Sequence, residues 1–126
     1  MPTGFRRWAC AIHMALIAVL SLLPAWRFPP SLAQIPGADK WAHVAMYGVL
    51  GALFRWAAEL EEARSPRWLL PAAAIGYGLL MEILQLTLRG GVRTFSWADA
   101  VANGVGAVGF WWGMGRFLQN REIPPR

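Results

Sequence analysis

The chain has 126 residues, of which 56% are hydrophobic and only 15% are charged, and it contains eight tryptophans. A soluble domain of this length is usually less apolar, so the composition favours a membrane protein. The single Cys10 excludes a disulfide framework within one chain. The net charge of +5 does not indicate nucleic-acid binding, because the arginines flank apolar segments instead of forming a basic stripe with interleaved aromatic residues.

Four apolar segments are long enough to cross a bilayer, whose hydrocarbon core of about 30 Å requires about 20 residues of helix. None shows the strict alternation of a membrane β-strand, and a bilayer confines the backbone to helices or closed barrels. Tryptophans near the segment ends support these boundaries, because an indole prefers the headgroup level. We therefore predict a single all-α domain, residues 1–126, folded as a bundle of four transmembrane helices. The predicted spans are residues 8–25, 41–58, 68–88 and 98–118.

The basic residues that flank the spans predict the orientation, because cytoplasmic loops carry an excess of positive charge. The side with both termini and the loop between the second and third spans carries Arg6, Arg7, Arg55, Arg64, Arg67, Arg116, Arg121 and Arg126. The opposite side carries fewer, namely Arg27, Lys40, Arg89 and Arg93. Both termini are therefore predicted to be cytoplasmic.

A second interpretation of the N-terminus stays open. Arg6, Arg7, the apolar run after them and the small residues up to Ala33 resemble a signal peptide with its cleavage site. The apolar run is long for such a peptide, and Pro29 and Pro30 separate it from the cleavage site. We therefore prefer an uncleaved first membrane helix.

Polar side chains gather on one face of three predicted helices, in the half of the bilayer opposite the termini. They recur every three or four residues, which places them on one face of each helix. A charge in hydrocarbon costs about 2.5 to 3.5 kcal/mol on insertion scales, so such groups usually pair, face the bundle interior and mark function. We predict one polar pocket, open to the outside, whose ligand-binding residues are Asp39, Lys40, His43, Tyr47, Glu82, Gln85, Arg89, Arg93, Asp99 and Asn103.

Simpler roles stay open for several of these residues. Lys40, Arg89 and Arg93 also fit interfacial anchors that extend to the lipid headgroups. Asp99 also fits a cap of the fourth helix. A polar network that only holds the helices together is an alternative for the whole set. Glu82 is the hardest to explain in this way, because a carboxylate at its depth needs a cation or a proton.

Glycines of the fourth span indicate close packing between helices. Gly109 and Gly113 form a GxxxG pair, which permits close helix approach. Glycines of the second and third spans are able to receive it: Gly48, Gly51, Gly76 and Gly78. This pattern predicts a compact bundle, or a homo-oligomer formed through Gly109 and Gly113.

The order of motifs on these segments resembles that of the VanZ-like family. "DKWAHVAMYGVLG" from Asp39 supplies Asp-Lys followed by His and Tyr, and "EILQL" from Glu82 supplies Glu-x-x-Gln. An arginine at position 93 follows, and then "DAVANGVGAVGF" supplies Asp-x-x-x-Asn-x-x-Gly. The resemblance covers Asp39 to about Phe110. It implies a small multi-pass protein of the bacterial inner membrane, in a family whose name-giving member is linked to resistance against teicoplanin, a lipid-tailed glycopeptide that acts on cell-wall precursors.

Three functions are compatible with the predicted pocket. In the first, the pocket binds an anionic membrane lipid or a lipid-linked cell-wall precursor, whose phosphate or carboxylate is held by Arg89, Arg93 and Lys40. In the second, it is a membrane-embedded hydrolase or transferase with His43 or Glu82 as general base, oriented by Asp99 or Asp39.

In the third function, Glu82 and His43 relay protons in a small transporter, although four helices leave little room for a substrate path unless the protein oligomerises. No cofactor is expected, and no metal-ligand motif supports a divalent cation at His43 and the carboxylates. No nucleic-acid partner is expected. The catalytic candidates, if the protein is an enzyme, are His43, Glu82 and Asp99.

Overall fold

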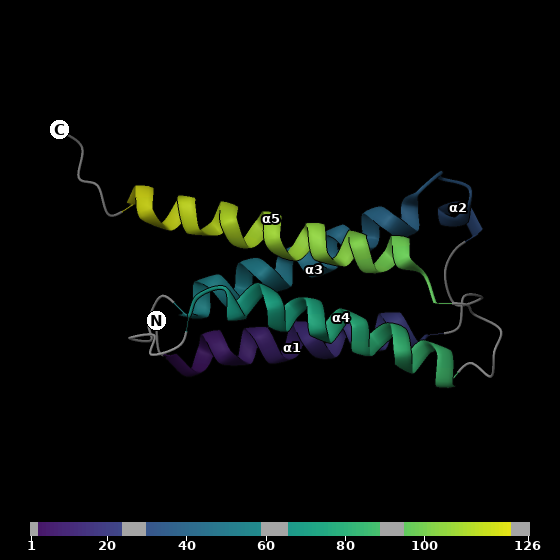
Figure 1. Cartoon of the computed structure of the whole chain (residues 1–126), viewed down its shortest axis with the longest axis horizontal. Coiled ribbons are helices and arrows are strands. Elements are labelled where there is room, and N and C mark those ends of the chain that lie inside the picture. Colours follow the sequence, from purple (N-terminus) through teal and green to yellow (C-terminus); the bar gives the residue numbers. More distant parts are fainter. Residues whose placement is uncertain (1–2, 24–29, 59–65, 89–94, 122–126) are drawn as a thin grey trace.

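The computed structural model describes residues 3–23, 30–58, 66–88 and 95–121. Within these ranges the chain is helical and contains no strand, as predicted for the fold class. The helices are α1 (Thr3–Leu22), the short α2 (Pro30–Ala33), α3 (Ala38–Ala58), α4 (Leu69–Leu88) and α5 (Trp97–Arg121). The four long helices lie side by side, and α1 begins at the same end of the bundle at which α5 ends (Figure 1).

The observed helices overlap the four predicted spans, and the largest difference is at the start of α1. This helix begins at Thr3 instead of residue 8 and ends at Leu22 instead of residue 25. Arg6 and Arg7 are good helix formers, so the helix extends beyond the apolar segment into the basic residues that precede it. A prediction based on apolar length alone does not include such a turn.

Local signals at two helix starts explain how the candidate site is positioned. Gly37, just before α3, has a φ of 72°, a left-handed conformation that glycine adopts without steric cost. At α5, the hydroxyl of Ser96 accepts a hydrogen bond from the backbone N–H of Asp99, with 3.2 Å between Oγ and N. Ser96 is therefore the N-cap of α5. Asp99 is therefore not the N-cap, but its carboxylate lies in the first turn of α5, where a negative charge complements the helix dipole, as the alternative also expected.

Glycines bring the backbones of α3 and α5 into direct contact. A Cβ atom added at Gly51 would lie 2.2 Å from the carbonyl oxygen of Ala107, and one added at Gly106 would lie 2.3 Å from the carbonyl oxygen of Val44. Any side chain at either position would force the helices apart. Gly51 therefore lies against α5, as predicted, but it faces the backbone of Ala107, while Gly106 of α5 faces the backbone of Val44 and Gly48. A Cβ at Gly109 or Gly113 would meet no atom within 4 Å, so this GxxxG pair does not pack inside the bundle.

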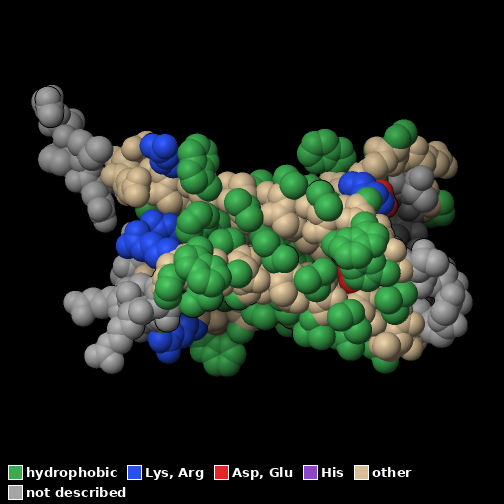
Figure 2. Space-filling model, in the orientation of Figure 1, with side chains coloured by type: hydrophobic (Ala, Val, Ile, Leu, Met, Phe, Trp, Pro, Cys, Tyr) green, Lys and Arg blue, Asp and Glu red, His purple; other side chains and the backbone are tan. Residues whose placement is uncertain are grey.

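Two helices are long and apolar enough to cross a membrane, namely α1 over Gly4–Leu22 and α4 over Leu69–Leu88. Only 17% of the α1 segment and 33% of the α4 segment are buried, whereas the core helix of a soluble protein is mostly buried. Hydrophobic side chains cover the middle of the face shown in Figure 2, with lysine and arginine toward its two ends. The arrangement indicates membrane association. A signal sequence at the N-terminus would resemble α1 in length and composition.

Candidate functional site

Three helices bring four buried polar side chains together. His43 lies in the second turn of α3, Glu82 in the second half of α4, and Asp99 and Asn103 in the first two turns of α5. Their exposed fractions are between 2% and 8%. One ligand atom each of His43, Glu82 and Asp99 lies within 4.8 Å of the other two. We refer to these four residues as the buried cluster.

A hydrogen bond between His43 and Asn103 sets the orientation of the imidazole. Nδ1 of His43 lies 2.8 Å from Oδ1 of Asn103, and an amide oxygen only accepts, so Nδ1 is the donor. Nε2 of the neutral ring then carries the lone pair. It lies 3.9 Å from Oδ2 of Asp99. The imidazole nitrogen thus faces carboxylate oxygens, an arrangement that can hold a metal ion.

Lys40 connects the buried cluster to the surface. Its Nζ lies 3.0 Å from Oδ1 of the buried Asp99 and 2.5 Å from Oδ2 of the exposed Asp39, while the lysine side chain itself is 42% exposed. Both residues precede the predicted span of α3. The hydrogen bond from Lys40 holds the pKa of Asp39 below its ordinary value. The same bond, followed by the one to Asp99, raises the pKa of Lys40.

Tyr47 and Gly78 lie next to the buried cluster. Tyr47 is fully buried one turn below His43, with the two rings parallel at a centroid distance of 6.5 Å. Among the described residues, neither the Tyr47 hydroxyl nor Nδ2 of Asn103 has a hydrogen-bond partner. A Cβ at Gly78 would lie 3.0 Å from Nδ2 of Asn103 and 3.1 Å from Cε1 of Tyr47. Gly78 therefore makes room for both side chains, a role that its spacing of four residues from Glu82 would have indicated.

The remaining predicted site residues are not part of the buried cluster. Gln85 is buried, but its Nε2 donates to the carbonyl oxygen of Ser21 at 2.8 Å, which ties α4 to α1. Asp39 lies at the exposed start of α3. Arg89 and Arg93 lie outside the residues that the structure describes. Helices enclose the buried cluster. Two other described site residues, Lys40 and Asp39, form its exposed edge.

The cluster contains a set of atoms that fits a divalent cation. His43, Glu82 and Asp99 supply one nitrogen and two oxygen ligands, a combination found in zinc and manganese sites. Metal-bound histidines usually donate their other ring N–H to an oxygen, as His43 does to Asn103. The sequence contains no metal-ligand motif because the three ligands come from three different helices. General acid–base chemistry would use the same groups.

Comparisons with protein-family models, curated proteins and solved structures found no match to this chain.

Proposed function

We propose that the chain is a multi-pass protein of the bacterial inner membrane that binds an anionic lipid, or a lipid-linked cell-wall component, at the buried cluster and its Lys40 edge. In this proposal α1, α3, α4 and α5 all span the membrane and both termini are cytoplasmic. The resemblance to the VanZ-like family supports the location in the inner membrane. Glycopeptide resistance is linked to that family and is not part of this proposal.

The arrangement of α3 and α5 supports four spans. Both helices are long enough to cross a bilayer, with 21 and 25 residues. Their charged residues lie toward the helix ends: Asp39, Lys40 and Asp99 in the first turns, and Arg55, Arg116 and Arg121 in the last two turns. The start of α1 and the end of α5, at one end of the bundle, carry arginines, which supports cytoplasmic termini.

The ion pair between Lys40 and Asp99 is the observation that carries the binding proposal. It places a partly exposed ammonium group against Asp99, the residue through which Lys40 contacts the buried cluster. Two of its three N–H donors face Asp39 and Asp99, which orient the ammonium group, and the third can donate to a lipid phosphate at headgroup level. Arg89 directly follows Leu88, the last residue of α4, and Arg93 precedes α5; both stay predicted contacts of the phosphate.

Native mass spectrometry of the detergent-purified protein tests this proposal. We expect an anionic envelope lipid to remain bound to the wild type and to be lost from Lys40→Gln and Arg93→Gln. Arg121→Gln, which removes one positive charge at the other end of the bundle, is the matched control. Equal lipid retention by all four folded proteins would refute lipid binding at this site.

A second candidate function is a metal-assisted hydrolase or transferase that acts on the phosphate or acyl group of such a lipid. The convergence of His43, Glu82 and Asp99 favours it. A divalent cation there would polarise a phosphoryl or carbonyl oxygen, and a carboxylate or imidazole would accept a proton. In this case Glu82→Gln abolishes turnover of a lipid phosphate while the lipid stays bound. Retained turnover in folded Glu82→Gln and His43→Ala would exclude it.

A further inference from the structure

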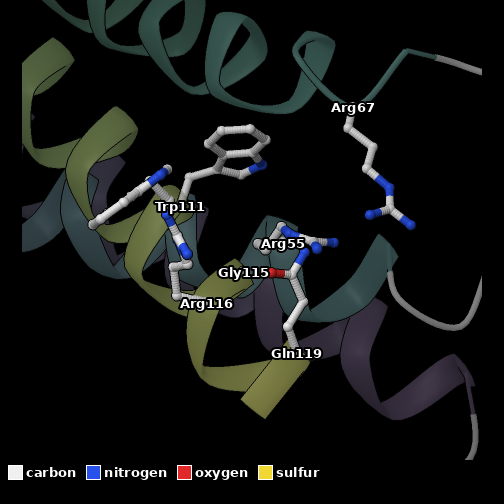
Figure 3. A pocket seen from close by; sticks show the side chains of 7 residues that line it. Arg55, Arg67, Trp111, Gly115, Arg116 and Gln119 are labelled. Atoms are coloured by element: carbon white, nitrogen blue, oxygen red, sulfur yellow. The ribbon is translucent and has the colours of Figure 1, made fainter. Parts of the chain in front are cut away.

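A cavity of about 170 Å³ lies at the end of the bundle opposite the buried cluster. Its wall is formed by α3, α5 and the turn before α4, and its lining includes three arginines from these three segments, Arg55, Arg67 and Arg116. Among the described residues that line it there is no aspartate or glutamate. We refer to it as the arginine cavity (Figure 3). It is far larger than the roughly 15 Å³ that a single water needs.

The Arg55 side chain is buried in the wall of this cavity. Its exposed fraction is only 4%, and its guanidinium crosses α5 at Gly115. A Cβ at Gly115 would lie 2.9 Å from Nε of Arg55, so the glycine provides the space that this side chain occupies. Figure 3 shows the guanidinium groups of Arg55 and Arg67 turned toward the same space, with Gln119 extending to it from α5.

Trp111 adds a buried donor to the same wall. Its indole Nε1 is buried and has no hydrogen-bond partner among the described residues. An indole N–H can only donate, so a hydrogen bond from it needs an acceptor outside the described residues. The neighbouring Arg116 lies with its guanidinium carbon 5.1 Å from the centre of the Trp112 ring, a cation–π contact that fixes the arginine at the cavity edge.

We propose that the arginine cavity binds a phosphate group. The guanidinium groups of Arg55 and Arg67 approach it as forked donors, which match phosphate oxygens, and the Trp111 N–H and the Gln119 amide supply further donors. Several cations from different segments fit a multiply charged anion with three terminal oxygens better than a single carboxylate. The phosphate belongs either to a lipid headgroup or to a free phosphate ion. The site does not depend on the function proposed for the buried cluster.

The test uses the purified full-length protein in detergent and in lipid nanodiscs. Inorganic phosphate, at ionic strength matched with potassium chloride, should raise the melting temperature of the wild type. Arg67→Gln removes an exposed guanidinium, and Gly115→Ala displaces that of Arg55 without changing the charge. We expect both variants to bind phosphate about tenfold more weakly, the effect of losing one charge-assisted hydrogen bond.

Two controls keep the test decisive. Gly113→Ala makes the same substitution one half-turn away, where a Cβ meets no atom within 4 Å, and should bind like the wild type. Lys40→Gln alters the other end of the bundle and should also bind like the wild type, so that failure of the two sites can be told apart.

The measurements in lipid nanodiscs distinguish a lipid phosphate from a free phosphate ion. Retention of phosphatidic acid but not phosphatidylglycerol, without an effect of inorganic phosphate, assigns a lipid phosphomonoester; an effect of inorganic phosphate alone assigns the free ion. Equal binding by wild type, Arg67→Gln and Gly115→Ala overturns the proposal, as does the absence of both ligands from the folded wild type. Binding only to a variant with Glu59, Glu61 and Glu62 changed to glutamine also overturns it, because the chain's own carboxylates would then fill the cavity.

Discussion

Among the described residues, the two ends of the bundle differ in the sign of their buried charges and in how their polar groups are held. At the α2 end, the carboxylates of Asp99 and Glu82 contact or approach their neighbours within the buried cluster. At the other end, Arg55 and Arg67 border a cavity. The first arrangement depends on contacts between the chain's own side chains, so its disruption should reduce stability. The second leaves a space for a ligand, so its disruption should mainly reduce binding.

This asymmetry follows from the parallel course of α3 and α5. Both helices begin at the α2 end, and each has a carboxylate in its first turn and an arginine in its last turn (Figure 1). Parallel helix dipoles repel each other, and charges of the appropriate sign at the ends offset part of that repulsion. The carboxylates in the first turns and the arginines in the last turns therefore both suit the parallel course of these two helices.

The largest effect is expected where α3 and α5 touch, between the two ends. Gly106→Leu places a side chain against the carbonyl oxygen of Val44 and should lower the free energy of unfolding by about 3 kcal/mol or more. SDS titration of the protein in mixed micelles measures it. Gly109→Ala is the control, because a Cβ there meets no atom within 4 Å. Similar losses in both variants would show that α3 and α5 do not pack through Gly106.

A smaller loss is expected when one hydrogen bond of the buried cluster is removed. Asn103→Ala leaves Nδ1 of His43 buried without its acceptor, which should cost about 2 kcal/mol of unfolding free energy. Asn120→Ala, at an exposed position near the end of α5, should cost less than about 0.5 kcal/mol. Equal stability of the two variants, measured by the same titration, would contradict the contrast between the two ends.

A pair of glycines on α4 should give effects of opposite sign. Gly78→Ala crowds Nδ2 of Asn103 and the Tyr47 ring and should destabilise the protein by about 1 kcal/mol. At Gly76 a Cβ meets nothing within 4 Å, so Gly76→Ala should gain about 0.5 to 1 kcal/mol through helix propensity. Thermal melts of both variants in detergent measure the difference. A gain at both positions would mean that Gly78 is not needed to accommodate the cluster.

The smallest effect on stability is expected at the exposed edge. Lys40→Gln removes the ion pairs to Asp39 and Asp99, but the lysine is 42% exposed and solvent screens its charge. The expected loss is at most about 1 kcal/mol. Denaturation at low and at high salt measures it, and the difference from wild type should shrink as salt rises. A loss as large as that of Asn103→Ala would place Lys40 within the structural core of the cluster.

The helices and the convergence of polar groups follow from sequence patterns. Spacings of four residues place His43 one turn from Tyr47 and Asp99 one turn from Asn103, and the alternating direction of consecutive helices brings Glu82 to the same end. The face on which a helix packs is harder to infer. Gly106 and the Gly109–Gly113 pair lie in the same glycine-rich segment, and only the tertiary structure shows that Gly106 contacts α3.

The arginine cavity could not be inferred from the sequence. Arg55, Arg67 and Arg116 fit the positive charge expected beside membrane spans, and a count of charges per side does not distinguish an anchor from a ligand-binding residue. Their common position depends on the turn before α4 and on the small size of Gly115. The hydrogen bond from Gln85 to the carbonyl oxygen of Ser21 could not be inferred from the sequence either, because Ser21 lies on a helix that is distant in the sequence.

The backbone contact between α3 and α5 also determines which parts of the protein can move. With no side chain between the helices at Gly51 and Gly106, neither helix can roll or slide past the other without a collision of carbonyl groups. The pair should therefore behave as one rigid unit that carries His43, Asp99 and Asn103. Glu82 is attached to α4, outside this unit. A tilt of α4 would separate one carboxylate from an otherwise fixed cluster, and slower hydrogen exchange in α3 and α5 than in α4 would reveal that division.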